Sequence, residues 1–183
     1  MKTKRNRGFT LVELMVVVSI IAVLVALLFP AIKTALLKAE VASSQTKAQA
    51  LVTAITAWNT TYGVWPIVSS TTQVPVDDNF VKLLTGQIAS SGSPSVIGNN
   101  PSQIKFLDIG KKDLDSSGNY IDAWQNIYQV VVDQTYGSQM KNILATSTTY
   151  QANICVFSAG PDHQWDQRGL TDTTNADNIV VWK

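Results

Sequence analysis

The chain has 183 residues and a formal net charge of +1, with 45% hydrophobic and 15% charged residues. This length accommodates one domain with an appended segment and excludes two full domains. The near-neutral charge argues against a general nucleic-acid binder, which usually carries a clustered basic excess. A single cysteine excludes an intramolecular disulfide, and a single histidine, His163, argues against a histidine-based zinc site or catalytic triad.

The N-terminal segment is far more apolar than the rest of the chain. Residues 14–32 carry no charge, and only Ser19 and Pro30 interrupt the apolar run. An α-helix rises about 1.5 Å per residue, so about 20 residues cross the hydrocarbon core of a bilayer. The run is apolar on every face, so it lacks the stripe with which a soluble helix packs on a core. We therefore predict a transmembrane helix at residues 9–32.

Basic residues before this segment set its expected orientation. They are Lys2, Lys4, Arg5 and Arg7. Positive charge ahead of an apolar segment keeps the N terminus in the cytoplasm, so the rest of the chain is expected outside it. An ordinary secretory signal peptide has a shorter apolar region and a small-residue cleavage site, which residues 29–38 lack. A plain signal anchor stays open on these grounds.

Glu13 places a charge inside the apolar segment. A charged side chain at the centre of a membrane-spanning helix costs about 2.5–3.5 kcal/mol on insertion scales, so such residues usually have a partner and a function. The segment contains no Lys or Arg that could pair with Glu13. A free α-amino group is one alternative partner.

Residues 7–14 read R-G-F-T-L-V-E-L. Together with the basic leader and the apolar run, they closely resemble the type IV prepilin signal. The resemblance implies that a prepilin peptidase removes the leader, residues 1–8, by cutting after Gly8, and that Phe9 becomes an N-methylated N terminus. It implies that Glu13 neutralises the α-amino group of a neighbouring subunit during filament assembly. Pro30 matches a proline of the family, and we expect a kink or local melting of the helix there.

A second helical pattern continues beyond the membrane segment. Apolar residues recur at spacings of three and four from Leu37 to Tyr62, so one helix is predicted from about Thr10 to about Tyr62. Its amphipathic part, residues 33–66, is expected to pack on a globular domain and to end at Gly63. Residues 62–66, Y-G-V-W-P, resemble the turn that closes this helix in type II secretion pseudopilins, and their aromatic side chains are expected in the core.

The remaining chain divides into a loop-rich and a strand-rich part. Residues 67–121 are predicted to form a variable loop region with one short helix at 78–85. Residues 122–183 are predicted to contain strands at 127–132, 153–158 and 178–182. The expected fold class is α+β, with the long helix packed on a small antiparallel sheet in a pilin-like arrangement. Cys155 is expected to be a buried core thiol.

Residues 122–133 carry a second resemblance. They read D-A-W-Q-N-I-Y-Q-V-V-V-D and resemble the D-P-W-G-x-P-Y-x-Y pattern in the sheet of major, G-type pseudopilins. The Asp, Trp, Asn and Tyr match, whereas both prolines and the glycine are replaced. This departure weakens the likeness to the G-type class without removing it.

Two acidic loops are candidate calcium sites. Residues 113–119 begin like an EF-hand loop, but position twelve is Trp124 instead of the bidentate glutamate, so a hairpin turn is favoured. The second loop, residues 158–179, resembles the calcium-binding C-terminal loop of major pseudopilins, although His163 replaces a glycine. The resemblance implies a structural Ca²⁺, and hard oxygen donors suit this ion. A polar loop without metal stays open. The candidate ligands are Asp177, Asp172, Asn175 and Asp162.

These patterns predict a structural subunit and not an enzyme, because no catalytic constellation is visible in the sequence. The resemblance implies a type II secretion pseudopilin, most like the major class, that waits in the bacterial inner membrane and then enters a periplasmic pseudopilus. Its expected partners are further copies of itself, prepilin peptidase, the inner-membrane assembly platform, other pseudopilins and membrane lipid, with no nucleic acid. The alternatives are a type IV pilin for adhesion, motility or DNA uptake, and a signal-anchored extracytoplasmic binding module.

Overall fold

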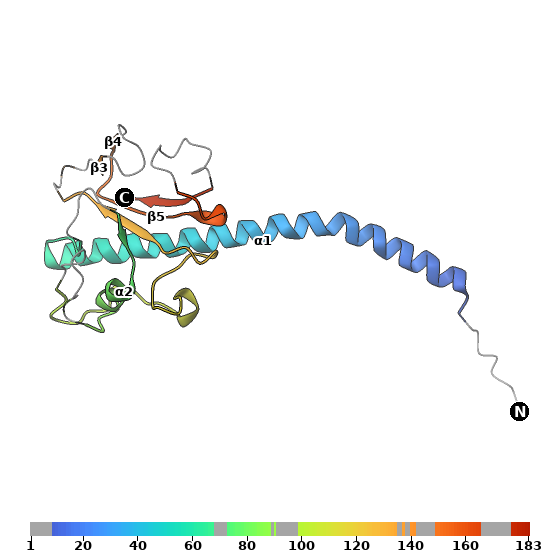
Figure 1. Ribbon diagram of the computed structural model, residues 1–183, viewed down its shortest axis with the longest axis horizontal. Helices are drawn as coiled ribbons and strands as arrows, with labels where there is room; N and C mark the ends of the chain where they lie inside the picture. Colours follow the sequence, from blue (N-terminus) through green and yellow to red (C-terminus); the bar gives the residue numbers. More distant parts are fainter. Residues whose placement is uncertain are drawn as a thin grey trace, which may run out of the picture. The chain divides into compact units, whose positions relative to one another are not determined.

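A computed structural model shows one long helix, α1 (Leu11–Tyr62), followed by a small sheet with short helices (Figure 1). The chain separates into two compact units, Met1–Glu40 and Val41–Lys183, and α1 contributes residues to both. The structure describes residues 9–67, 73–88, 90, 99–134, 137, 140–141, 149–165 and 177–183. The predicted extent of the long helix is confirmed to within one residue at its start.

The helix is continuous through Pro30, so of the two expected effects, a kink or local melting, the melting does not occur in this structure. Proline removes the hydrogen bond to the carbonyl of Ala26 and clashes with the preceding turn. Strong helix formers surround it, however, and their remaining hydrogen bonds keep the segment helical. The hydroxyl of Thr34 donates to the Pro30 carbonyl over 3.1 Å, one turn further on.

In the first unit, α1 has no buried residue between its start and Glu40. Within the described part of the chain, α1 is the one helix long and apolar enough to cross a membrane. In the second unit, α1 presents the predicted stripe to the core. Its fully buried members are Ser44, Ala48, Leu51, Ile55 and Trp58.

The helix ends as predicted. The last helical residue is Tyr62, and Gly63 follows with a φ of 71°, a left-handed conformation that glycine adopts without steric cost. The Gly63 N–H donates to the Asn59 carbonyl over 2.8 Å. Trp65, just beyond the turn, is buried, so the expectation of a core aromatic is confirmed there.

A four-stranded antiparallel sheet covers the second half of α1. Its strand order is β1 (Val74–Pro75), β2 (Gln129–Val132), β5 (Ile154–Ser158) and β6 (Ile179–Trp182). Alternate side chains on the strands pack against the helix stripe in one apolar core; on the two central strands they are Val130, Val132, Ile154 and Val156. The predicted α+β class is therefore confirmed.

Three strands were absent from the sequence prediction. Strand β1 lies in the region predicted to be loop-rich, and it is only two residues long and contains a proline. Strands β3 (Met140–Lys141) and β4 (Thr149–Tyr150) form a separate two-stranded sheet. Segments this short carry no alternation that a sequence pattern could detect.

One short α-helix and two 3₁₀ turns lie outside α1 among the described residues. Helix α2 (Asp78–Leu84) agrees with the predicted helix at 78–85 and buries its apolar side chains. Its N-cap residue is Asp77, whose carboxylate accepts a hydrogen bond from the Phe80 N–H over 2.8 Å. Two 3₁₀ turns, η1 (Lys111–Asp113) and η2 (Gly160–Asp162), precede and follow the central strands.

The other face of the sheet carries a second, smaller apolar cluster. It contains Val131, Ala152, Cys155 and Phe157, and Trp165 stacks on Phe157 with ring centroids 4.2 Å apart. Cys155 is 1% exposed, which confirms the predicted buried thiol. Burial raises the pKa of this thiol to about 12, so it is protonated and unreactive at neutral pH.

Candidate functional site

The start of α1 is closed by a reciprocal pair of side chains. The Glu13 N–H donates to the Thr10 hydroxyl oxygen over 3.2 Å. In return, the Thr10 N–H and hydroxyl both donate to Oε2 of Glu13, over 2.9 and 2.8 Å. This is a capping box, in which a threonine before the helix and a glutamate three residues later satisfy free N–H groups. The sequence prediction gave Thr10 no such role, although the T-x-x-E spacing was visible.

The cap occupies one oxygen of the Glu13 carboxylate. Among the described residues, Oε1 of Glu13 accepts no hydrogen bond. Phe9, which lies just before the cap, is 77% exposed. The carboxylate is thus held in place by its own chain and still offers one oxygen to a cation that comes from elsewhere. Gly8, the predicted cleavage residue, lies outside the described residues.

The apolar surface of the first unit surrounds α1. Every large apolar side chain from Phe9 to Leu37 is between 45% and 77% exposed. At the far end of the apolar run, the Lys33 ammonium lies 4.6 Å from the ring centroid of Phe29. Soluble monomers do not expose apolar surface on this scale, so the segment requires cover from lipid or from other protein.

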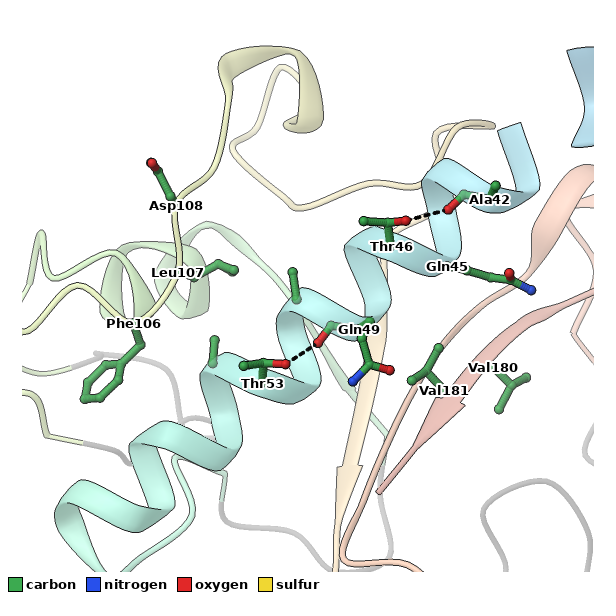
Figure 2. Close-up of a pocket in the computed structure, with 12 residues that line it drawn as sticks. Ala42, Gln45, Thr46, Gln49, Thr53, Phe106, Leu107, Asp108, Val180 and Val181 are labelled. Carbon is green, nitrogen blue, oxygen red and sulfur yellow. Dashed lines mark hydrogen bonds between the residues drawn. The ribbon is translucent and has the colours of Figure 1, made fainter. Parts of the chain in front are cut away.

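A shallow groove of about 830 Å³ runs along an exposed face of α1 in the second unit (Figure 2). The hydroxyls of Thr46 and Thr53 donate to the carbonyls one turn earlier, over 2.8 and 2.9 Å, so they point no free donor into the groove. Asp108 is the one ionisable residue among those that line it. The lining therefore contains a single titratable group and no pair of groups that could act as acid and base. Val180, Val181, Phe106 and Leu107 form its sides.

The first acidic loop is a hairpin turn. Asp113 forms an ion pair with Lys47 at 2.8 Å. The Asp115 carboxylate accepts hydrogen bonds from the N–H groups of Ser117 and Asn119 and from the Asn119 side chain, at 2.8–2.9 Å. The Asn119 backbone N–H is the main cause that lowers the pKa of Asp115. The two carboxylates are thus already engaged by protein groups, Asp113 in an ion pair and Asp115 in hydrogen bonds, in agreement with the favoured turn.

Residues 122–126 form a second turn of the same design. Oδ1 of Asp122 accepts from the N–H groups of Trp124 and Asn126, each over 2.8 Å, and Oδ2 accepts from the Asn126 side chain over 2.9 Å. Oδ2 also accepts from the Ser158 hydroxyl over 2.9 Å, which ties the turn to β5. Gln125 has a φ of 69° where the matching residue of the first turn is Gly118.

The second acidic loop is described only at its two ends. Asp162 and Asp177 belong to the described residues, whereas Asp172 and Asn175 lie outside them. Oδ1 of Asp162 accepts from the Gln164 N–H over 2.8 Å. The two ends touch, because a Cβ on Gly160 would lie 2.4 Å from the Asp177 carbonyl oxygen.

The donor chemistry at these ends suits a hard cation but does not complete a site. Carboxylates and backbone carbonyls are the ligands that Ca²⁺ takes, in sets of six to eight oxygens. No group of three acidic, histidine or cysteine side chains is placed to hold a metal within the part of the chain that the structure describes. A full ligand set would have to include residues beyond Asp162 and Asp177.

Comparison with known proteins finds a matching family model for the N-terminal segment. Residues 3–29 match the family model described as the prokaryotic N-terminal methylation motif. The chain is similar to the type IV major pilin protein PilE of Neisseria gonorrhoeae, with 28% identity over 119 residues, which covers 61% of this chain and 71% of the relative. It is also similar to the type IV major pilin protein PilE1 of the same organism, with 35% identity over 61 residues, or 33% of this chain and 28% of the relative. No solved structure matches the chain.

These similarities agree with the geometry at the start of α1. The methylation motif contains the capping pair and most of the exposed apolar run. Pilins are structural subunits and not enzymes, which confirms the prediction of a non-enzymatic chain. The apolar helix and the motif fit a membrane-anchored protein. The chain is therefore type IV pilin-like, a subunit with an N-terminal methylation motif.

Proposed function

We propose that this chain is a pseudopilin, a structural subunit of a type II secretion pseudopilus. Prepilin peptidase cuts it after Gly8, Phe9 is methylated, and the exposed half of α1 then leaves the bilayer to join the filament. The observation that carries this proposal is the continuous apolar exposure from Phe9 to Leu37, beside a carboxylate that is capped through one oxygen only. A helix of this kind is stable only when lipid or other subunits surround it.

Two features favour secretion over a pilus. Residues 122–128 keep the aspartate, tryptophan and tyrosine of the G-type pseudopilin pattern, and Asp122 is 3% exposed and bound to β5. The chain has a single, buried cysteine, so its C-terminal region is not closed by a disulfide of the kind that many type IV pilins contain.

A type IV pilin is the second candidate. Both curated relatives named above are type IV major pilins, and neither is a pseudopilin by its name. In this case the same helix would build a surface fibre for adhesion, motility or DNA uptake. The cleavage, the methylation and the role of Glu13 would be the same in both systems.

Deletion of the gene in its host distinguishes the two systems. A pseudopilin is required for the release of secreted proteins, so the deletion should lower extracellular protein yield and leave surface pili unchanged. Complementation with Glu13→Ala should fail, whereas Glu40→Ala, which removes an exposed glutamate beyond the apolar run, should restore secretion. Loss of pili with normal secretion would show that the type IV pilin assignment is correct.

We further propose that the C-terminal loop binds a structural Ca²⁺. Asp162 and Asp177 would supply oxygens from its two ends, and Asp172 and Asn175 would complete the set. The ion would join the ends of the loop and fix the surface that a neighbouring subunit meets. The support is the donor chemistry and the contact between Gly160 and the Asp177 backbone.

Thermal unfolding of the full chain in detergent micelles tests the calcium proposal. EDTA should lower the melting temperature, and CaCl₂ should restore it. The response should be lost in Asp177→Asn and kept in Asp108→Asn, because Asp108 is an exposed aspartate far from the loop in sequence. An identical melting temperature in EDTA and in CaCl₂ would contradict calcium binding.

Several partners follow from this function. The inner-membrane assembly platform and other pseudopilins would contact the exposed first half of α1 as the subunit leaves the membrane. The N terminus would lie in the cytoplasm before cleavage, and the second unit would lie in the periplasm. Crosslinking from a photoreactive residue at position 24 should capture a second copy of the chain, and capture of lipid alone during active secretion would contradict filament entry through this helix.

A further inference from the structure

Asn126 uses all of its side-chain polar atoms at the place where the C-terminal loop begins. Its Nδ2 donates to Oδ2 of Asp122 over 2.9 Å and to the Gly160 carbonyl over 2.7 Å. Its Oδ1 lies 2.6 Å from Nδ1 of His163. One amide thus joins the turn at residues 122–126 to two points of the loop's first end.

The partners of Asn126 determine which His163 nitrogen carries hydrogen. A carboxylate and a backbone carbonyl only accept hydrogen bonds, so the atom that faces both of them must be the amide nitrogen. The atom that faces His163 is therefore the amide oxygen, which only accepts. Nδ1 of His163 must then be the donor, and in the neutral ring Nε2 carries no hydrogen.

The backbone of His163 is in a strained conformation. His163 has φ 57° and ψ 19°, in the left-handed region where a residue with a Cβ is strained. A glycine would adopt this conformation freely, but it could not reach Asn126. The hydrogen bond from His163 to Asn126 therefore forms although the backbone of His163 is strained.

The other end of this chain of hydrogen bonds is firmly held. Asp122 is 3% exposed, and its carboxylate accepts from two backbone N–H groups as well as from the Ser158 hydroxyl at the end of β5. Ser158 is itself 1% exposed. His163 is thus linked, through Asn126 and Asp122, to the end of β5, a strand that is paired on both sides in the sheet.

We propose that Asn126 and His163 form a metal-independent latch that holds the first end of the C-terminal loop, Gly160 to Gln164, against the turn at residues 122–126. The latch positions Asp162, which lies between its two attachment points. Asn126 and His163 are positioning residues, since they act on the loop through these hydrogen bonds. The effect on calcium affinity rests on the calcium binding proposed above, whereas the latch itself does not.

The latch is tested first without metal, on the full chain in detergent micelles with EDTA at mildly alkaline pH. Long-range ¹H–¹⁵N correlation of the His163 ring should show hydrogen on Nδ1 and none on Nε2. In His163→Gly, the amides of residues 160–164 should exchange about fivefold faster, as expected for the loss of one hydrogen bond. Hydrogen on Nε2 in the native chain, or unchanged exchange in the variant, would overturn the latch.

Two alanine variants separate the latch from the turn that carries it. Asn126→Ala removes both the bond within its turn and the latch. Asn119→Ala removes the equivalent bond in the turn at residues 115–119 and a hydrogen bond from the Asp78 N–H, but no bond to the C-terminal loop. Asn126→Ala should therefore speed exchange at residues 160–164, and Asn119→Ala should leave these amides unchanged. Equal effects of the two variants on the loop would overturn the assignment to Asn126.

Calorimetric titration with CaCl₂ then tests the positioning of Asp162. If the native chain binds Ca²⁺, His163→Gly should weaken the affinity about fivefold, because binding must then also order the start of the loop. Equal affinities would overturn the positioning role. If the native chain shows no calcium binding, the calcium proposal is wrong, and the exchange and tautomer results alone decide the latch.

Discussion

The two halves of α1 differ in what covers them. From Ser44 to Trp58 the helix buries a stripe at spacings of three and four, and Ser44 and Lys47 form hydrogen bonds with residues outside the helix. From Phe9 to Glu40 it buries nothing, and its described side-chain bonds stay within α1 or its N-terminal cap. One continuous helix thus contains a segment stabilised by its own domain and a segment that depends on surroundings outside the chain.

The two halves of α1 have the same secondary structure, so their different environments, and not helix formation, distinguish their roles. Both halves are helical, because both contain good helix formers and the helix as a whole is capped at its start and at its end. Only the second half contributes to the apolar core of the second unit. In the proposed assembly, the first half would exchange lipid for other subunits without loss of any of these core contacts.

Truncation of a leucine in each half should show the largest difference. Leu51→Ala removes a fully buried side chain and should lower the free energy of unfolding by about 3 kcal/mol. Leu24→Ala removes a side chain that is 60% exposed and should change it by less than about 0.5 kcal/mol. Urea unfolding of the full chain in micelles, followed by tryptophan fluorescence, measures both. Equal losses would mean that the first half belongs to the same cooperative core.

Lysine substitutions test the polar contacts of the two halves. Lys47 pairs with Asp113 and also donates to the Ile121 carbonyl over 3.2 Å, and both ion-pair side chains are 17% exposed. Lys47→Met keeps the aliphatic stem but leaves a largely covered carboxylate unpaired, which should cost about 2 kcal/mol. Lys38→Met, at an exposed position in the first unit, should have no measurable effect on the same unfolding curve. A loss that disappears in high salt would show that Lys47 acts only through screened surface charge.

Two serines give a smaller contrast. The Ser44 hydroxyl is buried and accepts a hydrogen bond from the Ala123 N–H over 3.1 Å. Ser44→Ala should cost about 1 kcal/mol, as expected for one net hydrogen bond. The Ser19 hydroxyl donates to the Val16 carbonyl of its own helix, so Ser19→Ala should leave the unfolding of the second unit unchanged. A Ser44→Ala variant as stable as the native chain would show that the loop at residues 121–123 is anchored to α1 by its other contacts.

Loss of the N-terminal cap should have the smallest effect on the stability of the chain, and this effect should be confined to the first turn of α1. Thr10→Ala removes the capping hydroxyl, which is worth about 1 kcal/mol to the first turn of α1. Amide exchange at residues 11–14 should increase severalfold in micelles, while the unfolding of the second unit should not change. Slower or unchanged exchange at these residues would contradict the capping role.

Local patterns predicted the parts of the fold that depend on near neighbours. The helix from Thr10 to Tyr62 was recognisable from its periodicity and from Gly63, and the three long strands from their β-branched runs. Strand β1 was missed because its two residues are a strand only by pairing with β2, more than fifty residues later. The spacing of residues within a short segment cannot predict a pairing with a distant strand.

In the candidate site, too, only the features that depend on near neighbours could be predicted from the sequence. Glu13 was found because a charge in an apolar run is visible in the sequence, and the T-x-x-E cap could have been found by the same means. The link from Asp122 to Ser158 spans 36 residues, and the contact between Asn126 and His163 spans 37, so neither has a local pattern. Of the predicted calcium ligands, Asp172 and Asn175 lie outside the described residues, and the role of all four ligands stays a prediction.

The central claim is that residues 1–8 are a prepilin leader and that the exposed half of α1 is an assembly segment. Intact-mass analysis after co-expression with a prepilin peptidase tests it most directly. We expect a chain that begins at Phe9 and carries one added methyl group, and an uncleaved chain when Gly8 is replaced by alanine. A native chain that keeps Met1 to Gly8 in the presence of active peptidase would contradict the account.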